Sequence, residues 1–349
     1  MLTLFHLDNV LEMKRWDTFV DAHPDGTPFH LSGWLKSIHE TYSLEPWLFV
    51  LEGKEQSINA LAPFFRMKHP FQGNRLVSLP FSDYCAPLGL DEAFVLELLQ
   101  RIIDKAVLFA KKIEIRGPIP DMPDFNTRLY YKRHTLQLSP DPENVMNRID
   151  KRTIRYNIRK AQREGLDIVE ANNPKGIEAF QRLHILTRKK HGIPHQPKSF
   201  FMALARNLLA QKRAFLLLAA HDSQVIAASF FMEHQKTIFY KYNVSHPTML
   251  IKFSPNHLLT WKAIERGCRS GFERLDFGRT DPGNQGLMRY KKMWGAEVQD
   301  LPYCYSPASA HPFFRREDSP SLKFYKQLWR HVPESIASRI GPEILRRFG

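Results

Sequence analysis

A glycine-rich stretch in the last third of the chain brings basic side chains together beside an acid. It runs from Phe277 to Glu297 as FGRTDPGNQGLMRYKKMWGAE and directly follows Asp276. Glycines let the backbone approach a ligand closely, and fixed cations stabilise oxyanions and phosphates. The sequence therefore predicts a loop, a short helix and a turn that bind an anion. Its cations are Arg279, Arg289, Lys291 and Lys292.

Other chemistries lose support from the same stretch. It has the spacing of neither a Walker loop nor a GxGxxG fingerprint, which disfavours NTP hydrolysis and hydride transfer. A structural alternative stays open, in which the cations point to water and the larger side chains are core. Those side chains are Tyr290, Met293 and Trp294.

A second basic run precedes this stretch by more than 100 residues. RIDKRTIRYNIRKAQR, residues 148–163, holds seven basic residues and one acid. On a regular helix its arginines would form one continuous stripe, suited to phosphates. The alternative is a solvated cationic face, although like charges at i, i+4 repel one another. The stripe consists of Arg148, Arg152, Arg155, Arg159 and Arg163.

Length and composition describe a folded protein of two domains. The chain has 349 residues, 43% hydrophobic and 25% charged, with a formal net charge of +14. This surplus favours an anionic partner. The apolar run Ala214–Ala220 is far shorter than the roughly 20 residues that span a bilayer, and Asp8 and Glu12 interrupt any leader-like start. We therefore expect a cytoplasmic protein.

Cysteine usage points away from disulfides and zinc. The three cysteines are scattered, odd in number and without CxxC spacing. We expect reduced, buried thiols and no metal site. They are Cys85, Cys268 and Cys304.

The two halves of the chain repeat one order of elements. Trp47–Phe65 and Ala214–Phe231 both have the pattern of an apolar hairpin. A long amphipathic helix follows each hairpin, and a short strand ending in glycine comes next, KIEIRGP in one half and RLDFGRT in the other. We predict two tandem copies of a mixed α/β (α+β) unit, each a mixed sheet flanked by helices, at residues 1–138 and 139–310.

The motifs carry a family resemblance. RTDPGNQGLMRYKKMWGAE, the basic run, TRKKHG (187–192) and PNHLLTWKAIERG (255–267) resemble the FemAB-like, or BioF2-like, branch of the Gcn5-related N-acetyltransferase (GNAT) superfamily. The first half, with FHLSGWLKSIHETY and LVSLPFSDYCAPLG, is similar to the amino-terminal unit of these proteins. The resemblance implies two GNAT-like units and the transfer of an acyl or aminoacyl group to an amine.

The resemblance also implies roles for individual residues. In Fem-type enzymes, the lysine that corresponds to Lys291 contacts the substrate and stabilises developing charge. Asp276 is the candidate general base, with an ion pair to Arg279 as the structural alternative. The remaining predicted substrate-binding residues are Arg279, Asn284, Arg289, Tyr290, Lys292, Tyr240, Tyr242, Arg152, Arg155, Arg159, Ser82, Asp83 and Tyr84.

Two departures from the family bear on the acyl donor. Coenzyme A enzymes of this kind have a glycine-containing pyrophosphate loop, whereas Ser245–Trp261 contains no glycine. Fem cross-bridge enzymes insert a helical coiled-coil arm, and no such heptad run is present. We expect no tightly bound cofactor, and we keep acyl-CoA and aminoacyl-tRNA as alternative co-substrates.

The segment 311–349 is predicted as a basic amphipathic tail of two short helices. Its apolar seam consists of Ile336, Ile340, Ile344 and Phe348. The seam either packs on the body or, through residues 322–349, binds an anionic membrane at the inner face.

Taken together, the motifs and the resemblance predict acyl transfer to an amine of an anionic peptidoglycan or exopolysaccharide precursor. The alternative is a non-catalytic module that binds an anionic ligand or nucleic acid such as tRNA.

Overall fold

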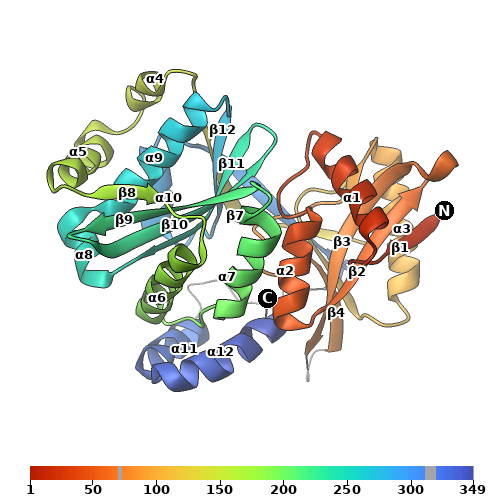
Figure 1. The fold of residues 1–349 in the computed structure, drawn as a ribbon. Helices are drawn as coiled ribbons and strands as arrows, with labels where there is room; N and C mark the ends of the chain where they lie inside the picture. Colours follow the sequence, from red (N-terminus) through yellow and green to blue (C-terminus); the bar gives the residue numbers. More distant parts are fainter. Residues whose placement is uncertain (70–72, 311–319, 349) are drawn as a thin grey trace. The chain divides into compact units, whose positions relative to one another are not determined.

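The computed structural model describes residues 1–69, 73–310 and 320–348 (Figure 1). The chain forms two compact units. The first comprises the described residues of 1–131, 300–315 and 343–349, and the second those of 132–299 and 316–342. The boundaries at 138 and 310 remain a prediction about the repeated sequence units. No helix in the described ranges is long and apolar enough to cross a membrane.

The first unit is a mixed sheet with the strand order β1-β2-β3-β4-β6-β13, and β5 pairs with β3. Every neighbouring pair is antiparallel except β4 and β6, which are parallel. Asn126–Gln137 (β7) and Glu297–Ser306 (β13) each contribute residues to both units. The other elements are β1 (Leu2–Phe5), α1 (Val10–Ala22), α2 (Ser32–Tyr42), β2 (Glu45–Glu52), a 3₁₀ turn (Lys54–Gln56), β3 (Ile58–His69), β4 (Gly73–Ser78), β5 (Leu88–Gly89), α3 (Glu92–Ala106) and β6 (Lys112–Arg116).

The second unit repeats this plan with the order β7-β12-β11-β10-β9-β8. Only β11 and β12 are parallel. Its elements are α4 (Pro142–Met146), a π-helix (Lys151–Arg155), α5 (Tyr156–Arg163), β8 (Asp167–Glu170), α6 (Pro174–His191), α7 (Lys198–Leu204), a second π-helix (Ala205–Leu209), β9 (Ala214–His221), β10 (Gln224–His234), β11 (Thr237–Ser245), α8 (Pro247–Phe253), α9 (Pro255–Arg269), β12 (Arg274–Thr280) and α10 (Gln285–Met293). Two helices, α11 (Pro320–His331) and α12 (Glu334–Phe348), end the chain.

The predicted repeat is confirmed as a fold. The hairpins are β2–β3 and β9–β10, and the strands that end in glycine are β6 and β12. Long amphipathic helices, α3 and α9, pack on the sheets of their own units. In the second unit α9 and α6 cover opposite faces of the sheet (Figure 1). Neighbouring strand residues point to opposite faces, so Phe231 joins the α9 core whereas Phe230 packs on Phe180 of α6.

The arginine stripe is the clearest correction to the sequence analysis. The chain from residue 148 to residue 163 is not one regular helix, because a π-helix at Lys151–Arg155 precedes α5. Asp150 caps this segment by accepting a hydrogen bond from the backbone N–H of Thr153 at 2.6 Å. The wider turn changes the angle between successive side chains, so a continuous stripe at 3.6-residue spacing does not form.

Candidate acyl-transfer site

The parallel strands β11 and β12 part beside a bulge. Their register pairs Thr237–Phe239 with Arg274–Asp276, and each strand then continues on its own course to Ser245 and Thr280. β12 is irregular between Asp276 and Arg279 on its other side, against β7. Gly278 lies inside this irregularity with φ +68°, a conformation that glycine adopts without strain. The backbone of β12 is therefore reshaped where the two strands separate.

Lys291 fixes that reshaped backbone. It lies on α10 and is 5% exposed. Its Nζ donates hydrogen bonds to the carbonyl oxygens of Phe277 (2.6 Å), Gly278 (3.1 Å) and Arg279 (3.3 Å). An ammonium has three N–H donors, so the observed geometry supports a positioning role. Direct contact of Lys291 with a reacting group remains a prediction.

Asp276 is fully buried at the end of the paired region. Its Oδ2 lies 2.7 Å from Nε of Arg133, and its Oδ1 accepts a 2.6 Å hydrogen bond from the backbone N–H of Gly278. The sequence analysis named Arg279 as the structural alternative, and it did not foresee the ion pair with Arg133. Because 143 residues separate the two, no local spacing could reveal it. The general-base role of Asp276 remains a proposal.

His134 belongs to the same cluster and was missed by the sequence analysis. It is fully buried on β7, and its Nδ1 lies 3.4 Å from Oγ1 of Thr280. Burial, followed by the charges of Lys291 and Lys292, lowers the pKa of His134 to about 4. The imidazole is therefore neutral near pH 7. Only the pairing of β7 with β12 brings it there, so no motif in the sequence marks it.

The two predicted tyrosines of β11 lie on opposite faces of the sheet. Residues i and i+2 of a regular strand share a face, but the register with β10 shifts between Tyr240 and Tyr242. Tyr240 stacks on Phe231 on the α9 side, and Thr260 of α9 lies 3.4 Å from its hydroxyl oxygen. Tyr242 packs instead among the aromatic side chains of α6 and α7, including Phe201. The two side chains therefore have different surroundings, and their common role in substrate binding remains a prediction.

The remaining predicted residues of α10 divide between packing and an open cavity. Asn284 caps the helix, accepting the Leu287 N–H at 3.1 Å, and Tyr290 packs edge-on against His257 and Trp294. The other α10 cations are exposed at the rim of a cavity of about 460 Å³. Its lining residues are Arg148, Asp150, Gln285, Met288, Arg289, Lys292 and Met293.

The arginines of the basic run have different surroundings. Arg155 donates to the carbonyl oxygens of Ile149 and Asn147 at 3.2 and 2.8 Å, so it supports the local fold. Arg152 and Arg159 are exposed. Of the three predicted contacts in this run, Arg152 and Arg159 keep the exposed surroundings expected of a surface that binds phosphate.

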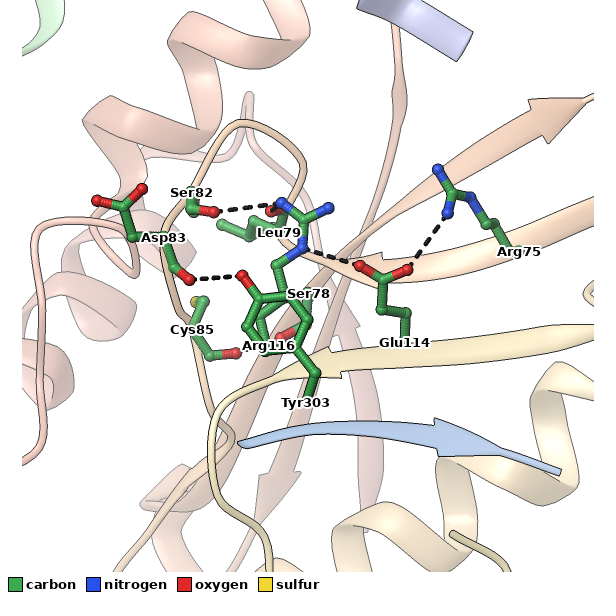
Figure 2. Close-up of polar contacts among 9 residues, drawn as sticks. All are labelled: Arg75, Ser78, Leu79, Ser82, Asp83, Cys85, Glu114, Arg116 and Tyr303. Carbon is green, nitrogen blue, oxygen red and sulfur yellow. Dashed lines mark hydrogen bonds and ion pairs between the residues drawn. The ribbon is translucent and has the colours of Figure 1, made fainter. Parts of the chain in front are cut away.

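The predicted loop of the first unit is held by a buried polar network (Figure 2). Arg116 donates to the carbonyl oxygens of Leu79 (2.8 Å) and Ser82 (3.2 Å), and the Tyr303 hydroxyl donates to the carbonyl oxygen of Asp83 (2.7 Å). Ser82 and Tyr84 are buried, whereas Asp83 is half-buried. Of the three predicted side chains, Asp83 has the surroundings best suited to contact an acceptor.

An acid occupies the same register position in both units. Where β4 and β6 run side by side, Glu114 of β6 lies opposite the third paired residue of β4. Where β11 and β12 run side by side, Asp276 of β12 likewise lies opposite the third paired residue of β11. Glu114 accepts from Arg116 Nε at 2.9 Å and from Arg75 Nη1 at 3.2 Å (Figure 2). Two residues beyond the acid, the first unit has Arg116 and the second has Gly278. The arginine binds the carbonyl oxygens of Leu79 and Ser82, which follow β4, whereas the glycine has no side chain at the corresponding position of β12.

Groups suited to a metal ion are absent from the described part of the chain, where no cluster of three His, Cys, Asp or Glu side chains occurs. The three cysteines are buried and unbridged.

A family comparison agrees with the geometry of the second unit. Residues 150–292 match the family model described as an acetyltransferase (GNAT) domain. The chain carries a GNAT acyltransferase domain. This match supports an acyltransferase. No curated protein sequence matches the chain.

Solved structures support the same fold for the whole chain. FemX is similar with a TM-score of 0.66 at 16% identity, over 86% of this chain and 96% of FemX. A tandem GNAT protein from the clavulanic acid biosynthesis pathway is similar with a TM-score of 0.54 at 10% identity, over 89% of this chain and 99% of that protein. The C-terminal domain of a putative lysylphosphatidylglycerol synthetase from Agrobacterium fabrum is similar with a TM-score of 0.57 at 10% identity, over 85% of this chain and 91% of that domain. These similarities confirm the predicted FemAB-like, tandem GNAT fold of the acyltransferase.

Proposed function

We propose that this GNAT acyltransferase moves an acyl or aminoacyl group from acyl-CoA or aminoacyl-tRNA to an amine of an anionic cell-envelope or polysaccharide precursor. The parting of β11 and β12 beside Gly278, inside the matched domain, is the observation that carries the proposal. An extended acyl arm can lie between two strands that no longer pair with each other. Both donors belong to the cytoplasm, where we place the reaction.

The reaction requires the protein mainly to position the two substrates and to stabilise the charge that develops. The amine nitrogen forms a bond to the acyl carbon, and the carbon–sulfur or carbon–oxygen bond to the donor breaks. The amine proton passes to a base and then to the departing thiolate or alkoxide. We assign Asp276 as the base candidate, and Lys291 as the residue that holds the β12 backbone where the oxyanion develops. Arg152 and Arg159 are proposed contacts to an anionic substrate.

The acceptor is proposed to involve the first unit. There the Arg116 side chain binds the carbonyls of Leu79 and Ser82 just beyond β4, which disfavours a second acyl arm at this position. The same arginine holds the loop that presents Asp83, and a carboxylate can bind an ammonium group of the acceptor. The names of two structural neighbours, FemX and a putative lysylphosphatidylglycerol synthetase, agree with aminoacyl transfer.

A donor screen tests the proposal. The full chain is incubated with radiolabelled acyl-CoA or aminoacyl-tRNA and with amine-bearing envelope precursors, and label transfer to the precursor is measured. Transfer from one donor supports the proposal and selects that donor. Hydrolysis alone, or no transfer from either donor to any amine, contradicts it.

The tail supports a further part of this proposal, contact with an anionic membrane. Trp329 and Ala337 are buried, and Gly192 of α6 lies against the backbone of Lys326. The tail therefore packs on the second unit. Its other apolar side chains remain exposed among basic ones, which suits an anionic lipid surface. The exposed side chains are Phe324, Leu328, Ile336 and Ile340; Ile344 is half-buried, and the Phe348 side chain lies outside the described part.

A further inference from the structure

A cavity of about 360 Å³ in the first unit takes no part in the chemistry assigned above. Its walls come from the residues that follow α2, from the strands β2 and β3, and from the last turns of α12. All eight lining residues lie outside the acetyltransferase domain matched at residues 150–292. Four of the eight are arginine or lysine. The first unit therefore has a candidate anion site of its own.

The sheet contributes two of these cations on one face. Arg66 and Lys68 are two residues apart on β3, so their side chains point to the same side of the sheet. Arg66 pairs across the strands with Glu45 of β2, at 3.3 Å from Nη1 to Oε2. Trp47 Nε1 in turn donates to Glu45 Oε1 at 3.1 Å, and the Arg66 guanidinium lies 5.6 Å from the centre of the Phe109 ring. This wall is preformed, which lowers the conformational cost of binding a ligand.

Helix α12 contributes the other two cations. Arg346 and Arg347 follow Glu343 at i+3 and i+4, so the three side chains are neighbours on one face of the helix. Glu343 Oε2 lies 3.6 Å from Arg346 Nη1, and its Oε1 lies 3.3 Å from Arg347 Nε. A guanidinium group has five N–H donors. The single carboxylate therefore leaves most donors of both arginines available to a ligand.

The charge of the lining indicates an anionic ligand. Four cations against two carboxylates leave a surplus of two positive charges. Lys68 is exposed, and no carboxylate of the described residues pairs with it. Like charges from β3 and α12 repel one another across the cavity unless an anion lies between them. Charge-assisted hydrogen bonds to phosphate oxygens are especially strong, so a phosphate ester fits this surplus.

The remaining lining residues indicate what the phosphate is attached to. The volume lies within the range of about 300–1,000 Å³ typical of small-molecule sites, so it accommodates more than a single phosphate group. The exposed hydroxyl of Ser43 and the carboxylates of Glu45 and Glu343 can bind hydroxyl groups. None of the eight lining residues is aromatic, and Leu44 is the one apolar residue among them. Hydroxyl groups therefore suit this cavity better than a nucleobase or an acyl chain.

We propose that this cavity binds a phosphorylated polyol, with its phosphate between the cations of β3 and α12 and its hydroxyl groups on Ser43 and the two carboxylates. Two sources share this chemistry, a soluble sugar or glycerol phosphate and the headgroup of a phospholipid. The bound ligand joins the last turns of α12 to the sheet of the first unit. The site is independent of the proposed acyl transfer, because it uses neither Asp276 nor Lys291.

Equilibrium binding to the full chain tests the cavity without requiring turnover. The soluble probes are sn-glycerol 3-phosphate and inorganic phosphate. The variant Lys68→Gln/Arg346→Gln removes one cation from each wall, while the ion pairs of Arg66 and Arg347 keep their partners. We expect glycerol 3-phosphate to bind at least about tenfold more weakly to this variant. The same ligand should raise the melting temperature of the wild type more than that of the variant.

A matched variant controls for the loss of charge. Lys54→Gln/Arg101→Gln removes an exposed lysine and an exposed arginine that is paired with a glutamate, both elsewhere in the first unit. It should bind glycerol 3-phosphate as the wild type does. Equal losses in the two double variants would show that overall charge, rather than the cavity, attracts the ligand.

Vesicle binding separates the two sources. Phosphatidylcholine vesicles carry equal shares of either phosphatidylglycerol or phosphatidylserine, which have the same net charge but only the first of which has a polyol headgroup. Stronger sedimentation with phosphatidylglycerol, lost in the cavity variant alone, assigns the cavity to a lipid headgroup. Binding of glycerol 3-phosphate without this preference assigns it to a soluble ester. No binding of glycerol 3-phosphate together with no vesicle preference, or inorganic phosphate binding as tightly as the ester, would overturn the polyol phosphate site.

Discussion

The Nζ atom of Lys291 lies 2.6 Å from the carbonyl oxygen of Phe277, in the β12 segment that departs from regular pairing. Two further carbonyls, of Gly278 and Arg279, accept from the same ammonium. One buried side chain thus joins α10 to the place where β11 and β12 separate. The position of the candidate site depends on this contact.

Replacement of Lys291 should damage both turnover and stability. In Lys291→Met the three carbonyls lose a charged donor, and an unsatisfied buried polar group costs about 1–3 kcal/mol. We predict a lower melting temperature and a turnover reduced about 100-fold or more. Acyl transfer and thermal unfolding are measured side by side. The control is Lys190→Met, at an exposed position of α6. Wild-type turnover in Lys291→Met would remove this residue from the site.

Arg116 should control the acceptor loop of the first unit. Arg116→Ala leaves Glu114 with only one of its two arginine partners and removes the donor from the carbonyls of Leu79 and Ser82. Breaking one partner of a buried ion pair costs about 3–5 kcal/mol. We predict earlier urea unfolding, faster proteolysis near residues 79–86, and a raised KM for the acceptor.

A matched variant tests whether this effect is local. Arg101→Ala removes an arginine of an exposed ion pair with Glu97 on α3, and such pairs contribute about 0–1 kcal/mol. It should unfold almost as the wild type does. Equal destabilisation by the two substitutions would show that the Arg116 network does not hold the loop.

Local sequence patterns predicted the elements better than the contacts between them. The hairpins and the strands ending in glycine follow from apolar spacing and turn residues, which act over a few positions. The ion pair between Asp276 and Arg133 depends on the pairing of β7 with β12, between distant parts of the chain. The π-helix at residues 151–155 and the register shift at Tyr240 are single-residue departures from regular geometry. Average periodicity does not encode them, so the continuous arginine stripe was wrong and the different surroundings of Tyr240 and Tyr242 could not be predicted.

Histidines whose pKa is lowered in the fold should make the second unit sensitive to acid, among them the buried His134 and the half-buried His257. Burial lowers the pKa of His134 and of His257 to about 4, against 6.5 for the unperturbed side chain. Between these values the unfolded chain binds more protons, so the free energy of unfolding should fall as the pH drops from about 6.5 to about 4. Each histidine contributes up to about 1.4 kcal/mol per pH unit. Above pH 7 this contribution is constant.

His257→Phe isolates one of the two. His257 packs against Tyr290 and Trp294, so phenylalanine suits its surroundings. We predict that, between about pH 4.5 and about pH 6.5, the unfolding free energy of this variant depends less steeply on pH than that of the wild type. The control His331→Phe changes an exposed histidine of α11. The same slope in His257→Phe and in the wild type would contradict the assignment of a neutral, half-buried imidazole.

The exposed face of α11 should bind anionic lipid independently of catalysis. Phe324 and Leu328 are 64% and 55% exposed at i, i+4, whereas Trp329 on the neighbouring face is 6% exposed. Burial of one large apolar side chain in a bilayer interface contributes about 1.5–3 kcal/mol. We predict that Phe324→Ser/Leu328→Ser reduces co-sedimentation with anionic vesicles tenfold or more. Its melting temperature and its transfer to a soluble acceptor should remain unchanged.

Trp329→Ala should instead destabilise the fold, because loss of a buried tryptophan costs about 3–5 kcal/mol of unfolding free energy. It should lower the melting temperature through the contact of the tail with α6. Added salt should weaken vesicle binding of the wild type, since screening reduces the attraction between basic side chains and anionic headgroups. If the wild type does not sediment with anionic vesicles, or the double variant sediments equally, the exposed apolar face serves a purpose other than membrane contact.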